Sequence, residues 1–553
     1  MTLPDDAMNG NERFNSSIFL GKPHDPLIDR LWLAVFAVAA LILLMLNLGT
    51  VPLKDWDEGL VAQVAREIWQ APAGTQTWLY PTLWGEPYFN KPPLIHWMIA
   101  GLYQFAGIHE WSARLPSALL TWGSVLLFYG VSRSVFYRRS PAVFATLVYL
   151  TSLPVIRYGR FAMLDGAILC FALLMLWFLL RSRQDYRYLL GAGLAFGLLC
   201  LTKGILVAIL LGGMALLFLA WDTPRLLRQP YLWLGFGLGS LPAIGWYGAQ
   251  WLHYGSGFLS HNLLEQSLQR IWTEVEANGA PPWYYLLEVL KYGAPWILFL
   301  PLGVRLAWRS RNLSWARLAI VWGGVYLLVI SVMATKLPWY VLPLFPAIAL
   351  MVGAQLAEMW HHGNSLELRP IELIPYSRVW PVLFGGLALV GWLSCAYWLF
   401  AHSPPDPFLS LISAAVGSTF TVAAILIYRQ NPQTLSILVW GTYLALALLM
   451  ISPHWAWELA EAYPVRPVAA IVEAQVPIGQ TVYTSYPYHR PSLNFYSQRL
   501  VRPLEEKQLR RTWRQTEQPY LLLDAAMLSQ LNLRSLKVLA EAEGWQLVTK
   551  DKI

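Results

Sequence analysis

The stretch LWLAVFAVAALILLMLNLG, residues 31–49, carries no charged side chain and approaches the roughly 20 residues that a membrane-spanning helix needs. It is longer than a signal-peptide core and no small-residue cleavage site follows it, so we expect a retained helix. Similar apolar runs recur as far as Ser452. Charged residues make up only 13% of the 553-residue chain, against about 25% in an average soluble protein. The sequence therefore predicts an α-helical polytopic membrane protein.

The arginines predict the orientation of this protein in the membrane. They cluster in alternate short loops, for example in 133–139 and 181–187, and an excess of positive charge is typical of cytoplasmic loops. The apolar segment 94–107 is too short for a span and is expected to lie in the membrane interface. About thirteen spans are predicted, over 31–50, 112–132, 141–158, 163–181, 188–202, 204–221, 231–251, 286–306, 316–334, 338–357, 379–400, 408–427 and 433–452.

The predicted organisation has three parts. A cytoplasmic tail covers 1–30, a transmembrane domain covers 31–454, and an extracytoplasmic domain covers 455–553. The last part alternates short apolar strands with helical stretches, a pattern typical of a small α/β domain. In the first outer loop an amphipathic interfacial helix is expected, because four apolar residues share one of its faces: Leu60, Val61, Val64 and Ile68.

Acidic residues mark one side of the predicted membrane domain. Asp57 and Glu58 follow the first span, at the mouth of any cavity between the helices. They have a simpler explanation as the start of the amphipathic helix, since acids favour a helix N-terminus. Asp165 lies at the outer edge of a span among apolar residues, where an ionisable group is costly and indicates function. A purely structural ion pair with Arg157 or Arg160 is the alternative.

Lysines lie on the same predicted face. Lys91 precedes two prolines, and Lys203 and Lys336 interrupt apolar stretches between spans. Each could be an anchor whose ammonium reaches the interface. Together, next to carboxylates and opposite the arginine-rich side, they favour a membrane enzyme that holds a phosphate and leaves a base free.

The motif DWDEGLVAQVAREIW, residues 55–69, resembles the first-loop acidic motif of GT-C class glycosyltransferases, in the branch of protein O-mannosyltransferases and lipid A aminoarabinose transferases. That family has thirteen spans and interfacial helices in its first outer loop. The resemblance covers roughly residues 30–360 in order, through GEPYFNKPPLIHW, WSARLPSALL, RFAMLD, LTKG, PPWYYLLEVLKYGAPW and KLPWYVLPLFPAIAL.

The resemblance implies a sugar donor on a polyprenyl phosphate and an inverting displacement at the anomeric carbon. It implies Asp57 as the general base, with Glu58 supporting the loop or the acceptor. Asp165 would bind or position the acceptor. The leaving phosphate would be bound by cations and a hydroxyl, namely Lys91, Arg270 and Tyr340, with Lys203 and Lys336 as further candidates.

Metal binding is not expected to be obligatory. The aminoarabinose branch has an acid where this chain has Asn90, and a histidine where it has Gln266 beside Glu265. Both changes remove metal ligands, which leaves a divalent cation near His261 as the less favoured alternative. The three cysteines, Cys170, Cys200 and Cys395, lack metal-ligand spacing and predict no disulfide framework.

The expected partners are the lipid-linked donor, a lipid, protein or glycan acceptor, and membrane lipids, with no nucleic acid. Four C-terminal residues are candidate acceptor contacts, although tyrosines of a small β-containing domain are more often core: Tyr486, Tyr488, His489 and Arg490. The expected location is a bacterial inner membrane, with the site facing the periplasm. A transporter or flippase of a lipid-linked saccharide is the alternative function, and a non-catalytic scaffold is a third.

Overall fold

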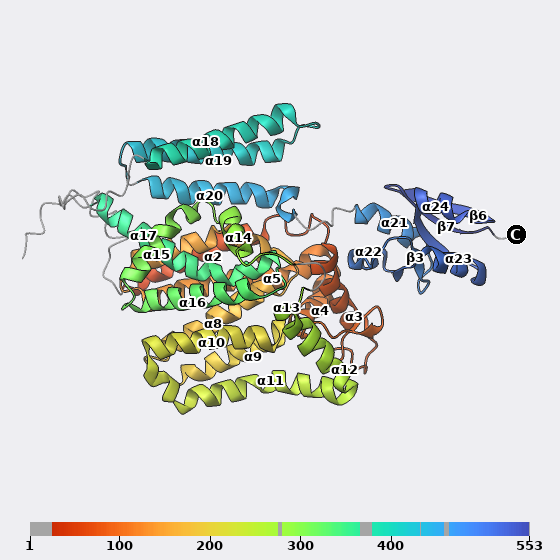
Figure 1. Cartoon of the computed structure of the whole chain (residues 1–553), viewed down its shortest axis with the longest axis horizontal. Coiled ribbons are helices and arrows are strands. Elements are labelled where there is room, and N and C mark those ends of the chain that lie inside the picture. Colours follow the sequence, from red (N-terminus) through yellow and green to blue (C-terminus); the bar gives the residue numbers. More distant parts are fainter. Residues whose placement is uncertain (1–24, 275–278, 365–378, 432, 458–463, 552–553) are drawn as a thin grey trace, which may run out of the picture.

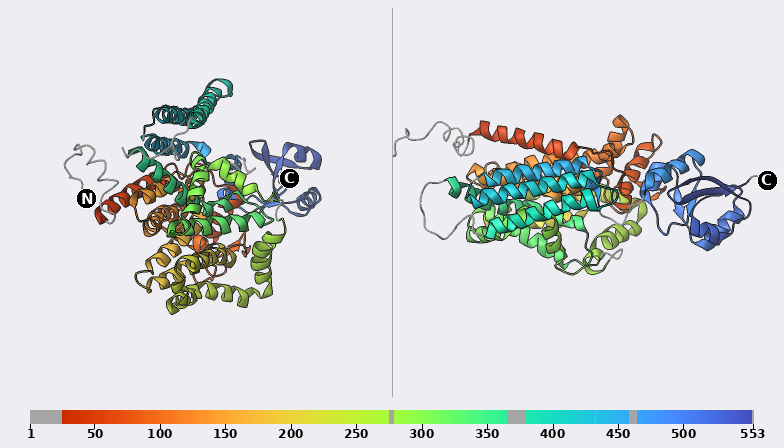
Figure 2. Two further views of the ribbon diagram at one scale, coloured as in Figure 1. Left: turned by 60° about the vertical axis from the view of Figure 1, so that its left-hand side comes forward. Right: turned by 90° about the horizontal axis from the view of Figure 1, so that it is seen from above.

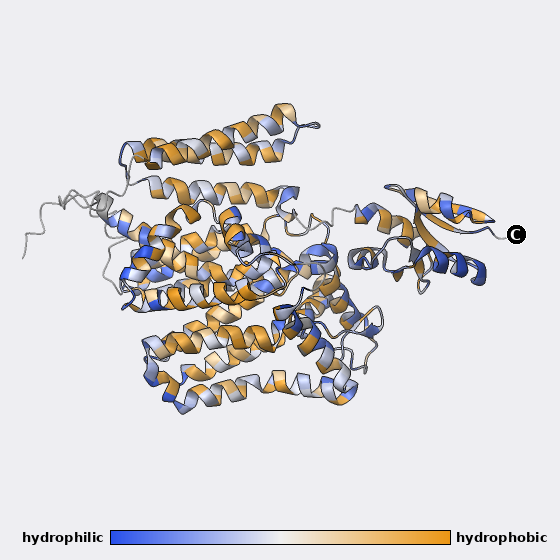
Figure 3. Ribbon diagram, viewed as in Figure 1, coloured by the Kyte–Doolittle hydropathy of each residue, from blue (hydrophilic) through white to orange (hydrophobic). Residues whose placement is uncertain are grey.

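A bundle of apolar helices forms most of the molecule (Figures 1 and 3). The structure is a computed structural model that describes residues 25–551, apart from 275–278, 365–378, 432 and 458–463. The bundle helices are α2 (Pro26–Met45), α5 (Glu110–Val135), α6 (Arg139–Leu150), α7 (Leu153–Arg160), α8 (Asp165–Arg181), α9 (Tyr188–Lys203), α10 (Ile205–Asp222), α11 (Pro230–Tyr254), α15 (Leu300–Arg309), α16 (Ser314–Val332), α17 (Phe345–Asn364), α18 (Val379–Ala396), α19 (Pro407–Tyr428) and α20 (Thr434–Ile451).

The chain is a multi-span membrane protein. Among the described residues, eight helices are long and apolar enough to cross a membrane, or up to ten if each of two bent pairs is one span. Three more predicted spans coincide with α8 (17 residues), α9 (16 residues) and α11 (25 residues). The number thirteen stays a prediction.

Two predicted spans are broken, which corrects the expectation of single helices over 141–158 and 286–306. The first bends by 52° between α6 and α7, where Pro154 occupies the first turn of α7. The second bends by 115° between α14 (Tyr284–Tyr292) and the segment Trp296–Arg309. Pro295 stands at this break, and proline lacks the N–H that would continue a helix. The bend gives α14 a different direction from α15.

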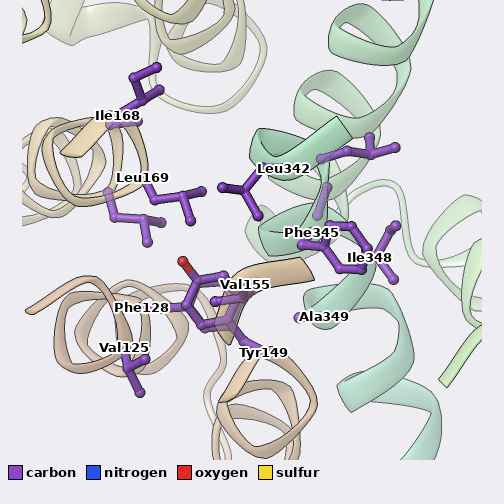
Figure 4. Close-up of a cluster of buried hydrophobic side chains, with 14 of the residues drawn as sticks. Val125, Phe128, Tyr149, Val155, Ile168, Leu169, Leu342, Phe345, Ile348 and Ala349 are labelled. Carbon is purple, nitrogen blue, oxygen red and sulfur yellow. The ribbon is translucent and has the colours of Figure 1, made fainter. Parts of the chain in front are cut away.

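The core between α5, α6, α7, α8 and α17 is closely packed. Phe128, Tyr149, Leu169 and Phe345 converge from four of these helices and are fully or almost fully buried (Figure 4). Such packing fixes the helix ends from which the polar residues project. Helices α18 and α19 pack on each other and α19 packs on α20; the three run side by side in the right view of Figure 2.

The two long outer loops form short elements at one end of the bundle (Figure 1). The first loop contains the π-helical turn η1 (Asp55–Gly59), α3 (Leu60–Gln70), the β1–β2 hairpin (Thr82–Leu83 and Glu86–Pro87) and α4 (Leu94–Ala106). On α3, Val61 and Val64 of the predicted apolar face are buried. The second loop contains α12 (Ser256–Leu259), the π-helix η3 (Ser260–Leu268) and α13 (Gln269–Trp272).

Beyond these loops lies an α/β unit with strands β3 (Val482–Thr484), β4 (Val501–Pro503), β5 (Tyr520–Asp524), β6 (Leu536–Ala542) and β7 (Trp545–Lys550). Their order is β4-β3-β5-β7-β6, parallel from β4 to β5 and antiparallel after it. Side chains alternate along β5, so Tyr520 and Leu522 enter one core, and Leu521 and Leu523 enter the other. The helices are α21 (Val465–Gln475), α22 (Pro491–Ser497), α23 (Glu506–Gln515) and α24 (Ala525–Leu531). Its status as a separate extracytoplasmic domain stays a prediction.

Candidate active site

The acidic motif forms a wide turn rather than a regular helix start. Glu58 N and Gly59 N both donate to Lys54 O, at 3.2 and 2.7 Å, and α3 begins with no side-chain cap. The simpler explanation of Asp57 and Glu58 as helix caps therefore does not describe α3. Single π-helical turns frequently mark functional sites. In this one, three carboxylates have three different surroundings.

Glu58 is fully buried against the bundle. Arg114 of α5 donates to both of its carboxylate oxygens at 2.7 Å. The backbone N–H groups of Ala162 and Lys54 donate as well, at 2.8 and 3.1 Å. A buried ion pair is favourable only when further hydrogen bonds complete it, and these do so. Glu58 therefore ties the first outer loop to the bundle.

Asp55 ties the same loop to the α/β unit, and sequence analysis did not single it out. Arg490 donates to Asp55 Oδ2 through Nε and Nη2, each at 2.7 Å. Ser492 donates to Asp55 Oδ1 through its backbone N–H and its hydroxyl. Both Asp55 and Arg490 are 3% exposed. Arg490, predicted as an acceptor contact, therefore has its guanidinium in a buried junction.

Asp57 lines a cavity of about 260 Å³ that opens between the bundle and the outer loops. Acidic and basic side chains both line it, and aromatic rings complete the wall. The lining residues are Lys54, Asp57, Glu58, Arg157, Tyr158, Phe161, Met163, Tyr284, Glu288, Lys291, Pro338 and Trp339. Of the three acids in DWDE, Asp57 and Glu58 line this cavity, and Glu58 is the one whose carboxylate is held by Arg114.

Helix α14 supplies one wall of this cavity, which the sequence did not predict. Tyr284, Glu288 and Lys291 lie on successive turns of α14 and all line it. Glu288 is 7% exposed. The sequence did carry a signal for this wall. Polar residues occur too often in this segment for a helix that faces lipid.

A second polar cluster joins three predicted residues. Lys203 Nζ donates to Asp165 Oδ1 at 2.7 Å and lies 5.2 Å from the ring centre of Tyr340. The alternative pairing of Asp165 with Arg157 or Arg160 was wrong. Those arginines instead donate to backbone carbonyls of Trp455 and Leu46, respectively.

Lys336 caps a helix. Its ammonium donates to Ile330 O at 3.1 Å, Ser331 O at 2.8 Å and Met333 O, at the C-terminus of α16. Desolvation lowers the pKa of Lys336. Its three hydrogens are directed at these carbonyls, and its assignment to the donor phosphate stays a prediction. Arg270 is 8% exposed on α13, next to Thr335 N, which donates to Arg270 O.

The segment around Lys91 meets the second outer loop. His261 bridges the two, with Nε2 2.8 Å from Asn90 Oδ1 and Nδ1 2.8 Å from Glu265 Oε2. Lys91 is half-buried at this junction. One imidazole, one carboxylate and one amide make a poor donor set for zinc. Within the described residues, no group of three His, Cys, Asp or Glu side chains could hold a metal ion; the side chain of Gln266 lies outside them.

The remaining predicted acceptor contacts surround the Asp55–Arg490 junction. Tyr486 lies under the Arg490 guanidinium, 4.4 Å from ring centre to Cζ, and forms an edge contact with Tyr488. His489 stacks on Trp84 of the β1–β2 hairpin with ring centres 4.6 Å apart. Tyr488 is 43% exposed. None of the four lines the 260 Å³ cavity.

Residues 90–247 match a family described as dolichyl-phosphate-mannose-protein mannosyltransferase. An undecaprenyl phosphate-alpha-4-amino-4-deoxy-L-arabinose arabinosyl transferase of Pseudomonas fluorescens is 28% identical over 375 residues, which are 66% of this chain and 65% of the relative. The enzyme of the same description from Pectobacterium atrosepticum is 29% identical over 434 residues, 75% and 74% of the two chains. Three of the similar relatives are matched over only 65%, 60% and 64% of their own length.

The fold has a solved counterpart. The crystal structure of ArnT from Cupriavidus metallidurans bound to undecaprenyl phosphate superposes with a TM-score of 0.74. The superposition covers 94% of this chain and 98% of the other at 19% sequence identity, so it shows a shared fold. The archaeal oligosaccharyltransferase AglB of Archaeoglobus fulgidus is a more distant neighbour, with a TM-score of 0.51.

Proposed function

Because this chain belongs to the GT-C glycosyltransferase family, we propose that it transfers a sugar from a polyprenyl-phosphate donor to an acceptor at the extracytoplasmic membrane face. The acceptor is a lipid, a protein or a glycan. One observation carries the proposal. Asp57 lines a cavity together with the cations Lys54, Arg157 and Lys291, and its neighbours Asp55 and Glu58 are bound in buried arginine pairs that hold the turn.

Asp57 acts as the general base in this proposal. Its carboxylate takes the proton of the acceptor nucleophile, which attacks the anomeric carbon from the face opposite the phosphate. The bond from that carbon to the phosphate oxygen breaks, and the electron pair leaves with the polyprenyl phosphate. A single displacement of this kind inverts the anomeric centre. Glu58 and Arg114 hold the turn that positions Asp57.

Cations stabilise the negative charge that grows on the leaving phosphate. Lys54, Arg157 and Lys291 line the cavity with Asp57. Lys91 and Arg270 lie on the outer loops, and in this scheme they take the phosphate as it leaves. No step in this scheme uses a metal ion.

In this scheme the Asp165–Lys203 pair positions the acceptor. Its contact with Tyr340 orients the ring, whose hydroxyl donates to the phosphate. The proposed location is a bacterial inner membrane, with the α/β unit and the cavity in the periplasm. Nucleotide sugars are confined to the cytoplasm, so a lipid-linked sugar is the donor available on that face.

Purified protein in proteoliposomes tests this function. With a radiolabelled polyprenyl-phosphate sugar and an extract of candidate acceptors, we expect loss of the donor and label in a new product. Mass spectrometry of lipids that copurify with the protein identifies the sugar. A transporter would move the donor across the bilayer and leave it intact, so translocation without cleavage would contradict an enzyme. Lys91→Ala is expected to slow the transfer.

A further inference from the structure

We propose that a second cavity, between α3, the β1–β2 hairpin and α22, binds a neutral sugar residue of the acceptor. That this sugar belongs to the acceptor rests on the proposed function. The cavity has a volume of about 200 Å³ and adjoins one of about 450 Å³, with which it shares Arg66, Gln70 and Gln498. None of the residues that line these two cavities lines the 260 Å³ cavity of Asp57.

The acidic side chain of this second cavity, Glu67, has hydrogen bonds to the protein on both of its carboxylate oxygens. Glu67 accepts four hydrogen bonds, from Gln63 Nε2 at 3.0 Å, Thr82 Oγ1 at 2.7 Å, Trp84 N at 2.7 Å and Gly85 N at 3.3 Å. These bonds saturate both carboxylate oxygens and hold the hairpin on α3. The carboxylate therefore has little capacity left for a cationic ligand.

The basic side chains of the cavity, Arg66 and Arg499, also form hydrogen bonds to the protein. Arg66 donates to Phe495 O at 2.7 Å and to Gln70 Oε1 at 3.3 Å. Arg499 donates to backbone carbonyls on both sides of α22, including Val476 O at 2.8 Å and Gln498 O at 3.1 Å. Charged groups that are committed to the protein do not favour an anionic ligand.

Some neutral polar atoms of the cavity wall have no hydrogen-bond partner among the described residues. These atoms are Gln63 Oε1, Trp84 Nε1 and Asn494 Nδ2, and all three are buried. Asn494 is 3% exposed, and its Oδ1 already accepts from Val501 N at 3.1 Å. A buried polar atom without a partner costs free energy, so one acceptor and two donors here require a partner of their own.

The hairpin turn holds the Trp84 indole at a conformational cost. Trp84 and Gly85 form the two-residue turn between β1 and β2, with φ of 58° and 79°. A bulky residue rarely adopts this left-handed conformation, and such strain concentrates at functional sites. Stacking against His489 then links the turn to the α/β unit.

A sugar ring matches this combination. Its hydroxyls both donate and accept, which suits two amides and an indole N–H, and it carries no charge. A cavity of this size holds one ring, and its neighbour of about 450 Å³ accommodates an adjoining residue. The site therefore selects a neutral glycan portion, apart from the atom that receives the transferred sugar.

Saturation-transfer NMR on the full chain in nanodiscs, without any lipid-linked donor, tests this inference. The probes are neutral methyl glycosides and disaccharides, with glucuronate as the charged control. Trp84→Phe removes the indole donor and keeps an aromatic ring, while Asn494→Asp keeps the acceptor for Val501 N and removes the amide donor. Trp78→Phe is the matched control, because Trp78 is 54% exposed in the same outer loop and lines neither cavity.

At least one neutral probe is expected to bind saturably. Its affinity should fall about tenfold in Trp84→Phe and in Asn494→Asp, and stay unchanged in Trp78→Phe and Asp57→Asn. Absence of saturable binding, or binding that both site variants leave unchanged, overturns the inference. Because no transfer is measured, a failed transferase assay does not affect this result. Where transfer is observed, Trp84→Phe should raise the acceptor KM and leave kcat unchanged.

Discussion

Three neighbouring carboxylates of one motif have three different surroundings. Asp55 binds Arg490, Glu58 binds Arg114, and Asp57 lines the cavity. The roles we propose follow from these surroundings. Two acids hold the turn between two structural units, and the third performs the chemistry.

Glu58→Gln should destabilise the fold. The change leaves the fully buried Arg114 without its counter-ion, and breaking such a pair costs about 3–5 kcal/mol. Equilibrium unfolding in mixed detergent micelles measures this free energy. Asp57→Asn is the matched control, since it changes another carboxylate of the same turn, one that lines the cavity. Equal stability of Glu58→Gln and wild type would show that the pair does not anchor the loop.

The sequence predicted the acids better than their partners. Asp57, Glu58 and Asp165 could be singled out because ionisable groups are rare beside apolar runs. Partners such as Arg114 and Lys203 lie 56 and 38 residues away, and only the packing of the helices brings them together. The contact of Lys336 with the end of the preceding helix was likewise not visible in its local sequence.

At the scale of elements, the α/β unit is held by a buried and an exposed ion pair. Arg490 and Asp55 are each 3% exposed, whereas Arg466, which pairs with Glu110, is 43% exposed. Exposed pairs contribute about 0–1 kcal/mol, and breaking a buried pair costs more. Arg490→Gln should therefore speed amide hydrogen exchange in α22, and Arg466→Gln should change it little. Comparable exchange in the two variants would contradict this ranking.

The stacked contact between His489 and Trp84 should respond to pH. Burial, and then the Arg502 cation, lower the pKa of His489 below its ordinary value of 6.5. The folded state therefore disfavours the proton, and stability present above pH 6.5 is lost as the pH falls through the lower folded pKa.

Thermal unfolding between pH 7 and pH 5 measures this loss. His489→Phe keeps an aromatic ring on Trp84 and removes the titrating group. The variant should lose less stability than wild type on acidification. Parallel pH profiles of the two proteins would show that His489 does not contribute.

The positions of helices along the chain were the more predictable part of the fold, and helix directions the less predictable. The lengths of the apolar runs placed a helix within each expected span. In lipid, the backbone N–H and C=O groups of such a run must form hydrogen bonds to one another, which a helix achieves. The same run length merged α14 with α15, although they meet at 115°. The turn at Gly293–Pro295 was visible in the sequence, and its consequence, a polar helix wall for the cavity, was not.

At the scale of the whole molecule, the predicted orientation places the first outer loop and the loop between α15 and α16 on opposite sides of the membrane. Single cysteines at Ala73 and Asn312, both exposed, test this in a variant with Cys170, Cys200 and Cys395 replaced by alanine. An impermeant thiol reagent added to intact cells should label Ala73→Cys only. Labelling of Asn312→Cys under the same conditions would contradict the predicted orientation.

The arrangement of the molecule places its proposed chemistry at the junction of three parts. The bundle contributes Arg157, the outer loop contributes Asp57, and α14 contributes Glu288 and Lys291 to one cavity. The order of motifs along the sequence predicted that the site lies at one end of the bundle. The composition of its walls depends on contacts between residues hundreds of positions apart.

Transfer from a radiolabelled polyprenyl-phosphate sugar in proteoliposomes, with Asp57→Asn beside wild type, tests the central claim most directly. We predict that Asp57→Asn keeps wild-type stability and transfers sugar about 10²–10⁴-fold more slowly, the contribution of a general base. Transfer by folded Asp57→Asn at the wild-type rate would contradict the role of Asp57.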